Sequence, residues 1–233
     1  MIIWKGIDLK TKGIINDTIP KIQKPKKRID IYEIYGRNGF LSVDNETYDS
    51  INMQIECHLP DDADMDEISA LLDGYGTISF DGSKQSTGIV SSNIEFDLIR
   101  NSGFKKFLLN LKINPIFEDI EETAEALSFT QVGDDYVSTI VEDFNYRVYP
   151  EEIIISLTED SDISFNGRTF SLKSGYYVLN CKMKEIVDND GDNASGKMDG
   201  NFPYLDTTGT NEIKISSNPS IFIIKYKKTY LMG

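Results

Sequence analysis

Residues 50–59, SINMQIECHL, alternate without a break between apolar and polar side chains. One face carries the apolar side chains of Ile51, Met53, Ile55, Cys57 and Leu59. A period of two over this length predicts a β-strand with one buried face. Pro60 ends the pattern, because proline has no backbone N–H to donate to a neighbouring strand.

A short helix is predicted directly after this strand. Asp64 can cap the helix, and Glu67 stands three residues later, which is the capping-box spacing. Gly74 suits the left-handed residue that ends many helices. The apolar stripe between these signals consists of Met65, Ile68, Leu71 and Leu72. The segment therefore predicts a helix of two to three turns.

Further strands are predicted between this helix and Pro115. One of them covers residues 104–114, FKKFLLNLKIN. Its apolar face carries Phe107, Leu109, Leu111 and Ile113. The first half of the chain is therefore expected to be β-rich, with strands around one short helix.

A change of composition follows at residues 117–129, FEDIEETAEALSF, which hold four Glu, one Asp and no basic residue. An acidic stretch after a proline stop is a plausible domain junction. A chain of 233 residues is long enough for two domains that each bury a core. We expect a first domain at residues 1–125 and a second at residues 126–233.

The second half predicts a β-sandwich. It contains short apolar strands separated by turns, which is the pattern of that architecture. Asn166-Gly167 is a strong signal for a tight hairpin. Further strands are expected at residues 151–157, 176–187 and 220–231.

A turn-rich stretch at residues 200–215, GNFPYLDTTGTNEIKI, suits a corner that caps the sandwich. Glycine and proline shape the turn, apolar side chains can close the end of the sandwich, and an asparagine can bond backbone at the start of the next strand. The residues assigned to this structural corner are Gly200, Phe202, Pro203, Leu205, Gly209 and Asn211. Ile213 and Ile215 are expected to point into the core.

Composition excludes several classes of protein. The net charge is −14, which makes tight nucleic-acid binding a poor hypothesis. No apolar run is long enough to insert into a membrane. No secretory signal is recognised, so synthesis in a cytoplasm is expected. Cys57 and Cys181 are interpreted as buried free thiols.

No catalytic, cofactor or metal site is predicted. The motifs of the common hydrolases and nucleotide-binding proteins are absent, and His58 falls on the polar face of its strand. Residues 188–199 partly match a calcium loop, with Asp188, Asp190, Asp192 and Asp199 at ligand positions but Asn193 in place of glycine. The flanks predict strands, so a polar hairpin turn is preferred, and weak calcium binding remains the alternative.

The densest basic cluster is KIQKPKKR, residues 21–28. It is open to three interpretations: a solvated arm, a contact with an acidic surface of an identical subunit, or a nucleic-acid patch. The following stretch RIDIYEIYG has no purely polar face, as expected if both faces are covered. The candidate subunit-interface residues are Lys21, Lys24, Lys26, Lys27, Arg28, Tyr32, Tyr35 and Arg37.

Three stretches together resemble the distal tail proteins (Dit) of long-tailed bacteriophages. The first is residues 19–41, with a proline, a strand and then Gly-Arg-Asn-Gly at 36–39. The second is the corner at residues 200–215, and the third is YKKTYL at residues 226–231. Their order and spacing make the resemblance more specific than any one of them.

The resemblance implies a mainly β protein with an N-terminal ring-forming domain and a C-terminal galectin-like β-sandwich. It implies a baseplate or tail-tip hub in the virion tail, without catalysis or cofactors. Six identical copies would close a homo-hexameric ring around a channel for DNA, with the tail tube protein on one face and tail-tip proteins on the other. The acidic charge would keep DNA from adhering to the channel wall.

An alternative function is a carbohydrate-binding module for attachment to the host surface. Such a site usually needs an exposed aromatic platform with polar neighbours. Trp4 is the only tryptophan and is distant in sequence from the sandwich. Tyr176 and Tyr177 are candidates, but neighbours on a strand point to opposite faces, so one of them is expected in the core.

Overall fold

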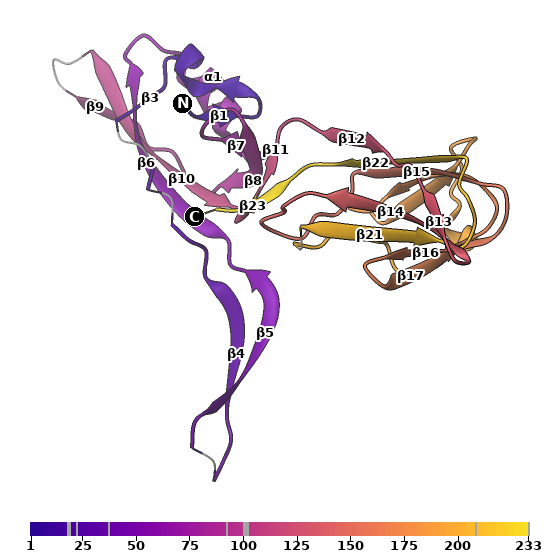
Figure 1. The fold of residues 1–233 in the computed structure, drawn as a ribbon. Helices are drawn as coiled ribbons and strands as arrows, with labels where there is room; N and C mark the ends of the chain where they lie inside the picture. The colour runs from indigo at the N-terminus through magenta and orange to yellow at the C-terminus, as the bar shows by residue number, and fades with distance from the viewer. Residues whose placement is uncertain are drawn as a thin grey trace. The chain divides into compact units, whose positions relative to one another are not determined.

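The computed structural model describes residues 1–17, 20–21, 23–36, 38–91, 93–99, 103–207 and 209–232, without the side chains of Glu46, Leu98 and Ile99. Within these ranges the chain is mainly β with a single α-helix, as the sequence predicts. It divides into two compact units, Met1–Glu118 with Leu231–Gly233, and Asp119–Tyr230 (Figure 1). The boundary expected near residue 125 lies inside a strand of the second unit, β12 (Thr123–Ala126).

One ten-stranded sheet dominates the first unit. Its main path runs in the order β2-β1-β7-β8-β10-β6-β3, while β9 pairs with β10, and β11 pairs with β8 and β23. The strands are β1 (Ile3–Trp4), β2 (Ile7–Asp8), β3 (Ile15–Asn16), β6 (Ile51–Pro60), β7 (Tyr75–Ser79), β8 (Lys84–Val90), β9 (Asp97–Ile99), β10 (Phe104–Ile113), β11 (Ile116–Asp119) and β23 (Thr229–Leu231).

Strands β6 and β10 form the centre of this sheet. They pair antiparallel along their whole length, with Cys57 opposite Phe107 and Ile55 opposite Leu109. Directly opposed residues of an antiparallel pair share one face, so the two alternating patterns bury the same side. The burial of β6 follows the expected alternation, which confirms the strand and its buried face.

The predicted helix is α1 (Met65–Leu72). The Asp64 carboxylate caps it by accepting from the backbone N–H groups of Asp66 and Glu67. A short 3-10 helix, η1 (Leu9–Lys12), lies beside it, and Lys12 pairs with Glu67 at 2.7 Å. Trp4 is fully buried, and its indole N–H donates to the Leu71 carbonyl at 3.0 Å. Helix α1 is therefore tied to the sheet by both packing and a hydrogen bond.

The second unit contains two sheets. The five-stranded sheet has the order β12-β22-β15-β18-β19, and the six-stranded sheet has the order β13-β14-β21-β16-β17-β20. The remaining bounds are β13 (Thr130–Val132), β14 (Asp135–Val141), β15 (Glu152–Leu157), β16 (Ser161–Phe165), β17 (Arg168–Leu172), β18 (Gly175–Asn180), β19 (Glu185–Asp188), η2 (Ser195–Lys197), β20 (Met198–Gly200), β21 (Thr210–Ile215) and β22 (Ile221–Tyr226).

A single apolar core joins these two sheets, which makes the second unit a β-sandwich. Ile155 and Ile224 come from one sheet, and Phe165, Ile213 and Ile215 come from the other. The tight hairpin is confirmed as well. Asn166 and Gly167 have φ values of 50° and 81°, the left-handed backbone that a two-residue hairpin turn requires.

Two expected strands are interrupted. The run over residues 176–187 breaks into β18 and β19, so Cys181 lies in a turn rather than in a strand, although it is buried. The last run breaks into β22 and β23 because the two parts have different partners. β22 pairs with β12 and β15 of the sandwich, whereas β23 pairs with β11.

Candidate assembly surface and the corner of the second unit

A separate two-stranded sheet is formed by β4 (Lys27–Glu33) and β5 (Phe40–Tyr48). The strands pair antiparallel, with Ile31 opposite Ser42 and Tyr32 opposite Leu41. Neither strand pairs with another strand of the described chain, and Figure 1 shows them as a ribbon of their own. A hairpin of this kind is marginally stable in water unless something covers it.

Both faces of the β4–β5 hairpin carry exposed apolar side chains. On one face, Ile31 and Phe40 are 63% and 67% exposed, with Ile29 beside them. On the other face, Tyr32 is 52% exposed and is joined by Leu41 and Val43. Contiguous exposed apolar side chains of this size mark interaction surfaces, and the outer edges of both strands are open to pairing.

The structure separates the candidate interface residues into distinct groups. Lys27 forms an ion pair with Asp44, and Arg28 Nε lies 2.8 Å from Asp49 Oδ1, so both cations are held within the hairpin. Tyr32 and Tyr35 are exposed, and Arg37 lies outside the described residues. Lys21, Lys24 and Lys26 are exposed and form no ion pair with any described residue.

Three exposed apolar residues of the hairpin were not predicted from the sequence as interface residues, namely Phe40, Leu41 and Val43 of β5. The signal for them was present. Phe40 and Leu41 are adjacent, and neighbours on a strand point to opposite faces. Together with the mixed faces of β4, this pattern indicates a hairpin that is apolar on both sides.

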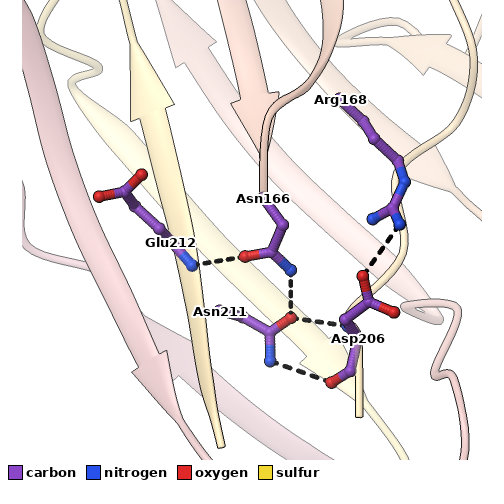
Figure 2. A network of polar contacts seen from close by, with 5 residues as sticks. All are labelled: Asn166, Arg168, Asp206, Asn211 and Glu212. Carbon is purple, nitrogen blue, oxygen red and sulfur yellow. Dashed lines mark hydrogen bonds and ion pairs between the residues drawn. The ribbon is translucent and has the colours of Figure 1, made fainter. Parts of the chain in front are cut away.

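The corner of the second unit is organised by one buried polar side chain, Asn211 at the start of β21 (Figure 2). Its side-chain oxygen accepts from the Asp206 backbone N–H and from the Asn166 side-chain amide, each at 2.6 Å. Its amide donates to the Asp206 carbonyl at 3.3 Å, and Asn166 Oδ1 accepts from the Glu212 N–H at 2.8 Å. The loop before β21 is therefore bonded across its base and to the β16–β17 turn.

The other corner residues fit closely around this network. Leu205 is fully buried in the sandwich core, Pro203 is buried, and Phe202 packs against the same core. Gly200 has a φ of 112°, and a Cβ atom there would lie 2.9 Å from Phe170 Cβ. A Cβ atom on Gly209 would lie 2.8 Å from Asp143 Oδ1. A structural role for these residues stays a prediction, which the substitutions in the Discussion test.

An aromatic and arginine cluster adjoins the corner. The guanidinium groups of Arg147 and Arg168 lie 4.1 Å and 4.0 Å from the centre of the Tyr204 ring. Arg168 also bonds Asp206 at 2.9 Å, and Tyr149 packs against Tyr204 with ring centres 5.5 Å apart. Sequence reasoning missed this cluster, because its members are far apart in the chain and follow no recognised spacing.

Both cysteine thiols are buried, and the single histidine contacts a carboxylate. Burial raises the pKa of the Cys57 thiol to about 12, with a smaller contribution from the Asp17 carboxylate. Burial likewise raises the pKa of the Cys181 thiol to about 12. His58 Nδ1 contacts the Asp17 carboxylate. Thiols with such pKa values are not nucleophiles at neutral pH.

The acidic stretch at residues 188–199 begins at the end of β19 with a turn and continues through η2 into β20. The Asp188 carboxylate accepts from the backbone N–H groups of Asp190 and Asp192, each at 3.0 Å. The stretch follows β19 rather than a helix. Across the described residues, no group of three or more His, Cys, Asp or Glu side chains has the geometry to hold a metal ion. The same described part of the chain has no helix long and apolar enough to span a membrane.

Comparisons with known proteins place this fold. No family model matches the chain, and no curated protein matches it significantly. Solved structures do match, among them the crystal structure of SPP1 Dit (gp19.1), described as a paradigm of the hub adsorption apparatus in phages that infect Gram-positive bacteria. It is 13% identical, with a TM-score of 0.75 over 99% of this chain and 98% of that chain.

At this identity the likeness shows a shared fold. The chain has the mainly β fold of the SPP1 Dit protein along almost its whole length. The resemblance to Dit proteins indicated by the sequence motifs is thus confirmed at the level of the fold.

Proposed function

We propose that this chain is a structural hub protein of a bacteriophage tail. The observation that carries the proposal is the fold match to a hub adsorption protein over 99% of the chain. In the proposed assembly, six copies form a ring that joins the tail tube protein to tail-tip proteins, and the chain works as part of the virion tail. Its function is to hold partners together, so it needs no catalytic group.

The β4–β5 hairpin supports self-assembly. A hairpin with two exposed apolar faces loses unfavourable contact with water when neighbouring copies cover it. Copies that contact each other through two different surfaces form a ring when the rotation between them closes after one full turn, and an open filament when it does not. The hairpin supplies one such surface, because it offers apolar side chains and open strand edges together.

The net negative charge of the chain is compatible with a channel that DNA passes through. Each copy carries a formal charge of −14, and a ring multiplies this charge around its axis. DNA and an acidic channel wall carry like charges and repel each other at short range, within roughly 8 Å at physiological salt. DNA would pass through such a ring without binding tightly to it.

No specific observation favours the carbohydrate-binding alternative. Trp4 is fully buried in the first unit, and Tyr177 is buried in the sandwich core. The guanidinium groups of Arg147 and Arg168 each lie about 4 Å from the centre of the Tyr204 ring. An aromatic platform for a sugar ring needs a free face.

The first experiment measures the mass of the purified chain in solution, with electron microscopy of the same sample. The expected species is six times the 26.4 kDa chain and is seen as a ring with a central hole. A chain that remains monomeric at every concentration contradicts the self-assembling hexamer.

A paired substitution links the ring to the hairpin. Ile31→Ser with Phe40→Ser is expected to abolish the ring while leaving the chain folded, because both side chains are exposed in the single copy. Val132→Ser is the matched control, since Val132 is 61% exposed on a strand of the second unit. Loss of the ring in the control as well would show that the effect is not specific to the hairpin.

A further inference from the structure

Two exposed surfaces of the first unit are complementary. One offers apolar side chains and the other an apolar hollow, and the charges beside them have opposite signs. What we call the donor face consists of Lys21, Lys24 and Lys26, which precede β4 in the chain, and of Ile29 and Ile31 on one face of β4. The acceptor face consists of a mainly apolar hollow beside β3 and of the acidic residues Asp61, Asp62 and Asp66 around the start of α1. The hollow is lined by Met1, Ile2, Leu9, Ile14, Ile15 and Cys57, together with the polar side chains of Asp8, Lys10 and Asn16.

The acceptor hollow is an unfilled apolar depression of about 430 Å³. Its floor is the buried side chains of Ile2, Leu9 and Ile14, and its rim includes Met1 and Ile15, which are 60% and 47% exposed. A hollow of this size accommodates one or two large apolar side chains. Ile29 and Ile31 of the hairpin are exposed side chains of that kind.

The charges beside the two surfaces are opposite and unpaired. Asp61, Asp62 and Asp66 are exposed and form no ion pair with any described residue, whereas Asp64 is used as the helix cap and Glu67 pairs with Lys12. Lys21, Lys24 and Lys26 are likewise exposed, without an ion pair to the described chain. Charge complementarity of this kind fixes the register between partners.

The acidic residues lie near the hollow along the chain. Ile15, which lines the hollow, pairs with His58 of β6, and Asp61 follows His58 by three residues. At about 3.3 Å per residue, the Asp61 backbone is roughly 10 Å from this pair.

The donor face and the acceptor face of the same copy lie too far apart to contact each other. The Lys26 carbonyl accepts from the Asp49 N–H, just before β6 begins at Ile51, while Asp61 follows the other end of β6 at Pro60. A strand of ten residues separates the ends by roughly 30 Å. Complementary surfaces at opposite ends of one unit produce a head-to-tail contact, which is the type that closes rings.

We propose that the donor face of one copy docks on the acceptor face of the next copy of this chain, with Ile29 and Ile31 entering the hollow and the lysines facing Asp61, Asp62 and Asp66. The inference rests on the proposed self-assembly into a ring. It goes further by naming which two surfaces meet and in which direction.

Charge reversal and charge exchange test this contact on the full chain. Lys21→Glu, Lys24→Glu and Lys26→Glu together, or Asp61→Lys, Asp62→Lys and Asp66→Lys together, are each expected to raise the concentration for half-assembly by about tenfold or more. The chain carrying all six changes restores opposite charges across the contact, so its assembly returns close to that of the unaltered chain. Asp134→Lys, Glu185→Lys and Asp190→Lys form a matched control on exposed residues of the second unit.

Chemical coupling provides a second readout. A carbodiimide joins a lysine amine directly to a carboxylate that it touches. In a mixture of unlabelled and heavy-nitrogen-labelled chains, mass spectrometry should find mixed-label links between the donor lysines and the acceptor aspartates. These links and the rescue by charge exchange together support the contact.

The outcomes separate this inference from the proposed function. Rings that form equally well in both reversal variants, without such links, overturn the docking contact and leave the hub standing. Reversal variants that fail to assemble but are not rescued by exchange also overturn it. A chain that forms neither rings nor links in its unaltered form overturns the docking contact together with the self-assembling hexamer.

Discussion

The side-chain amide nitrogen of Asn166 lies 2.6 Å from the side-chain oxygen of Asn211, so the β16–β17 turn is hydrogen-bonded to the first part of β21. The same Asn211 oxygen accepts the Asp206 backbone N–H (Figure 2). A buried amide with these partners replaces the water that the loop backbone would otherwise bind. One side chain therefore joins the turn, the loop and the strand into a single corner.

We expect Asn211→Ala to destabilise the second unit by about 2–3 kcal/mol, because it leaves the Asp206 N–H and the Asn166 amide without this partner in a buried setting. Chemical denaturation followed by circular dichroism measures the change. Asn201→Ala is the control, since Asn201 is an exposed asparagine of the same stretch, residues 200–215. Equal stability of the two variants would refute the corner role of Asn211.

Gly200 offers a backbone test of the same corner. Its φ of 112° is unfavourable for any residue with a Cβ atom, and that atom would lie 3.0 Å from the Phe170 backbone. We expect Gly200→Ala to cost about 1–3 kcal/mol of unfolding free energy. Gly196→Ala should be neutral within about 0.5 kcal/mol, because a Cβ atom there meets open space. Thermal melts of the two variants make the comparison, and similar melting temperatures would contradict the strain.

Local sequence patterns were sufficient for much of the fold. The alternation over residues 50–59 predicted a strand and its buried face, because one face of β6 packs into a core and the other does not. Asp64 predicted the start of α1, since a cap depends only on neighbouring backbone. Asn166-Gly167 predicted a hairpin for the same local reason.

Long-range contacts could not be read from these patterns. The bond from Asn166 to Asn211 and the stacking of Arg147 and Arg168 near Tyr204 join residues with no fixed spacing. The break between β22 and β23 was missed because it depends on which strands pair, not on hydrophobicity. The sequence did indicate that β4 has no polar face, but only the structure shows that both faces of the hairpin are exposed.

The buried cysteines give a test of native packing in both units. Cys57 and Cys181 are 0% and 1% exposed, and burial raises both thiol pKa values to about 12. Since the thiolate is the reactive form, we expect neither thiol to react with a thiol reagent in the native protein at neutral pH. Both should react in denaturant. Rapid labelling of Cys57 alone in the native protein would show that the hollow beside β3 opens to its floor.

The turn between β7 and β8 predicts a dependence of stability on acid. The Asp81 carboxylate accepts from the backbone N–H groups of Ser83 at 2.8 Å and Lys84 at 3.1 Å. The bond from Ser83 is the main cause that holds the Asp81 pKa below its ordinary value of 3.8, although burial opposes it. A carboxyl whose pKa is lower in the folded chain releases its proton more readily there than in the unfolded chain.

The stabilisation by Asp81 is therefore fully present above its unfolded pKa of 3.8 and is lost as the pH falls through the lower folded value. We expect Asp81→Asn to cost about 0.5–1 kcal/mol near neutral pH, a modest figure because the site is exposed. The deficit should shrink as the pH drops below the ordinary carboxyl pKa, since the native residue is then protonated as well. Urea unfolding at several pH values measures this, with Asp134→Asn as an exposed control. A deficit that stays constant down to strongly acidic pH would mean that the charge of Asp81 does not stabilise the turn.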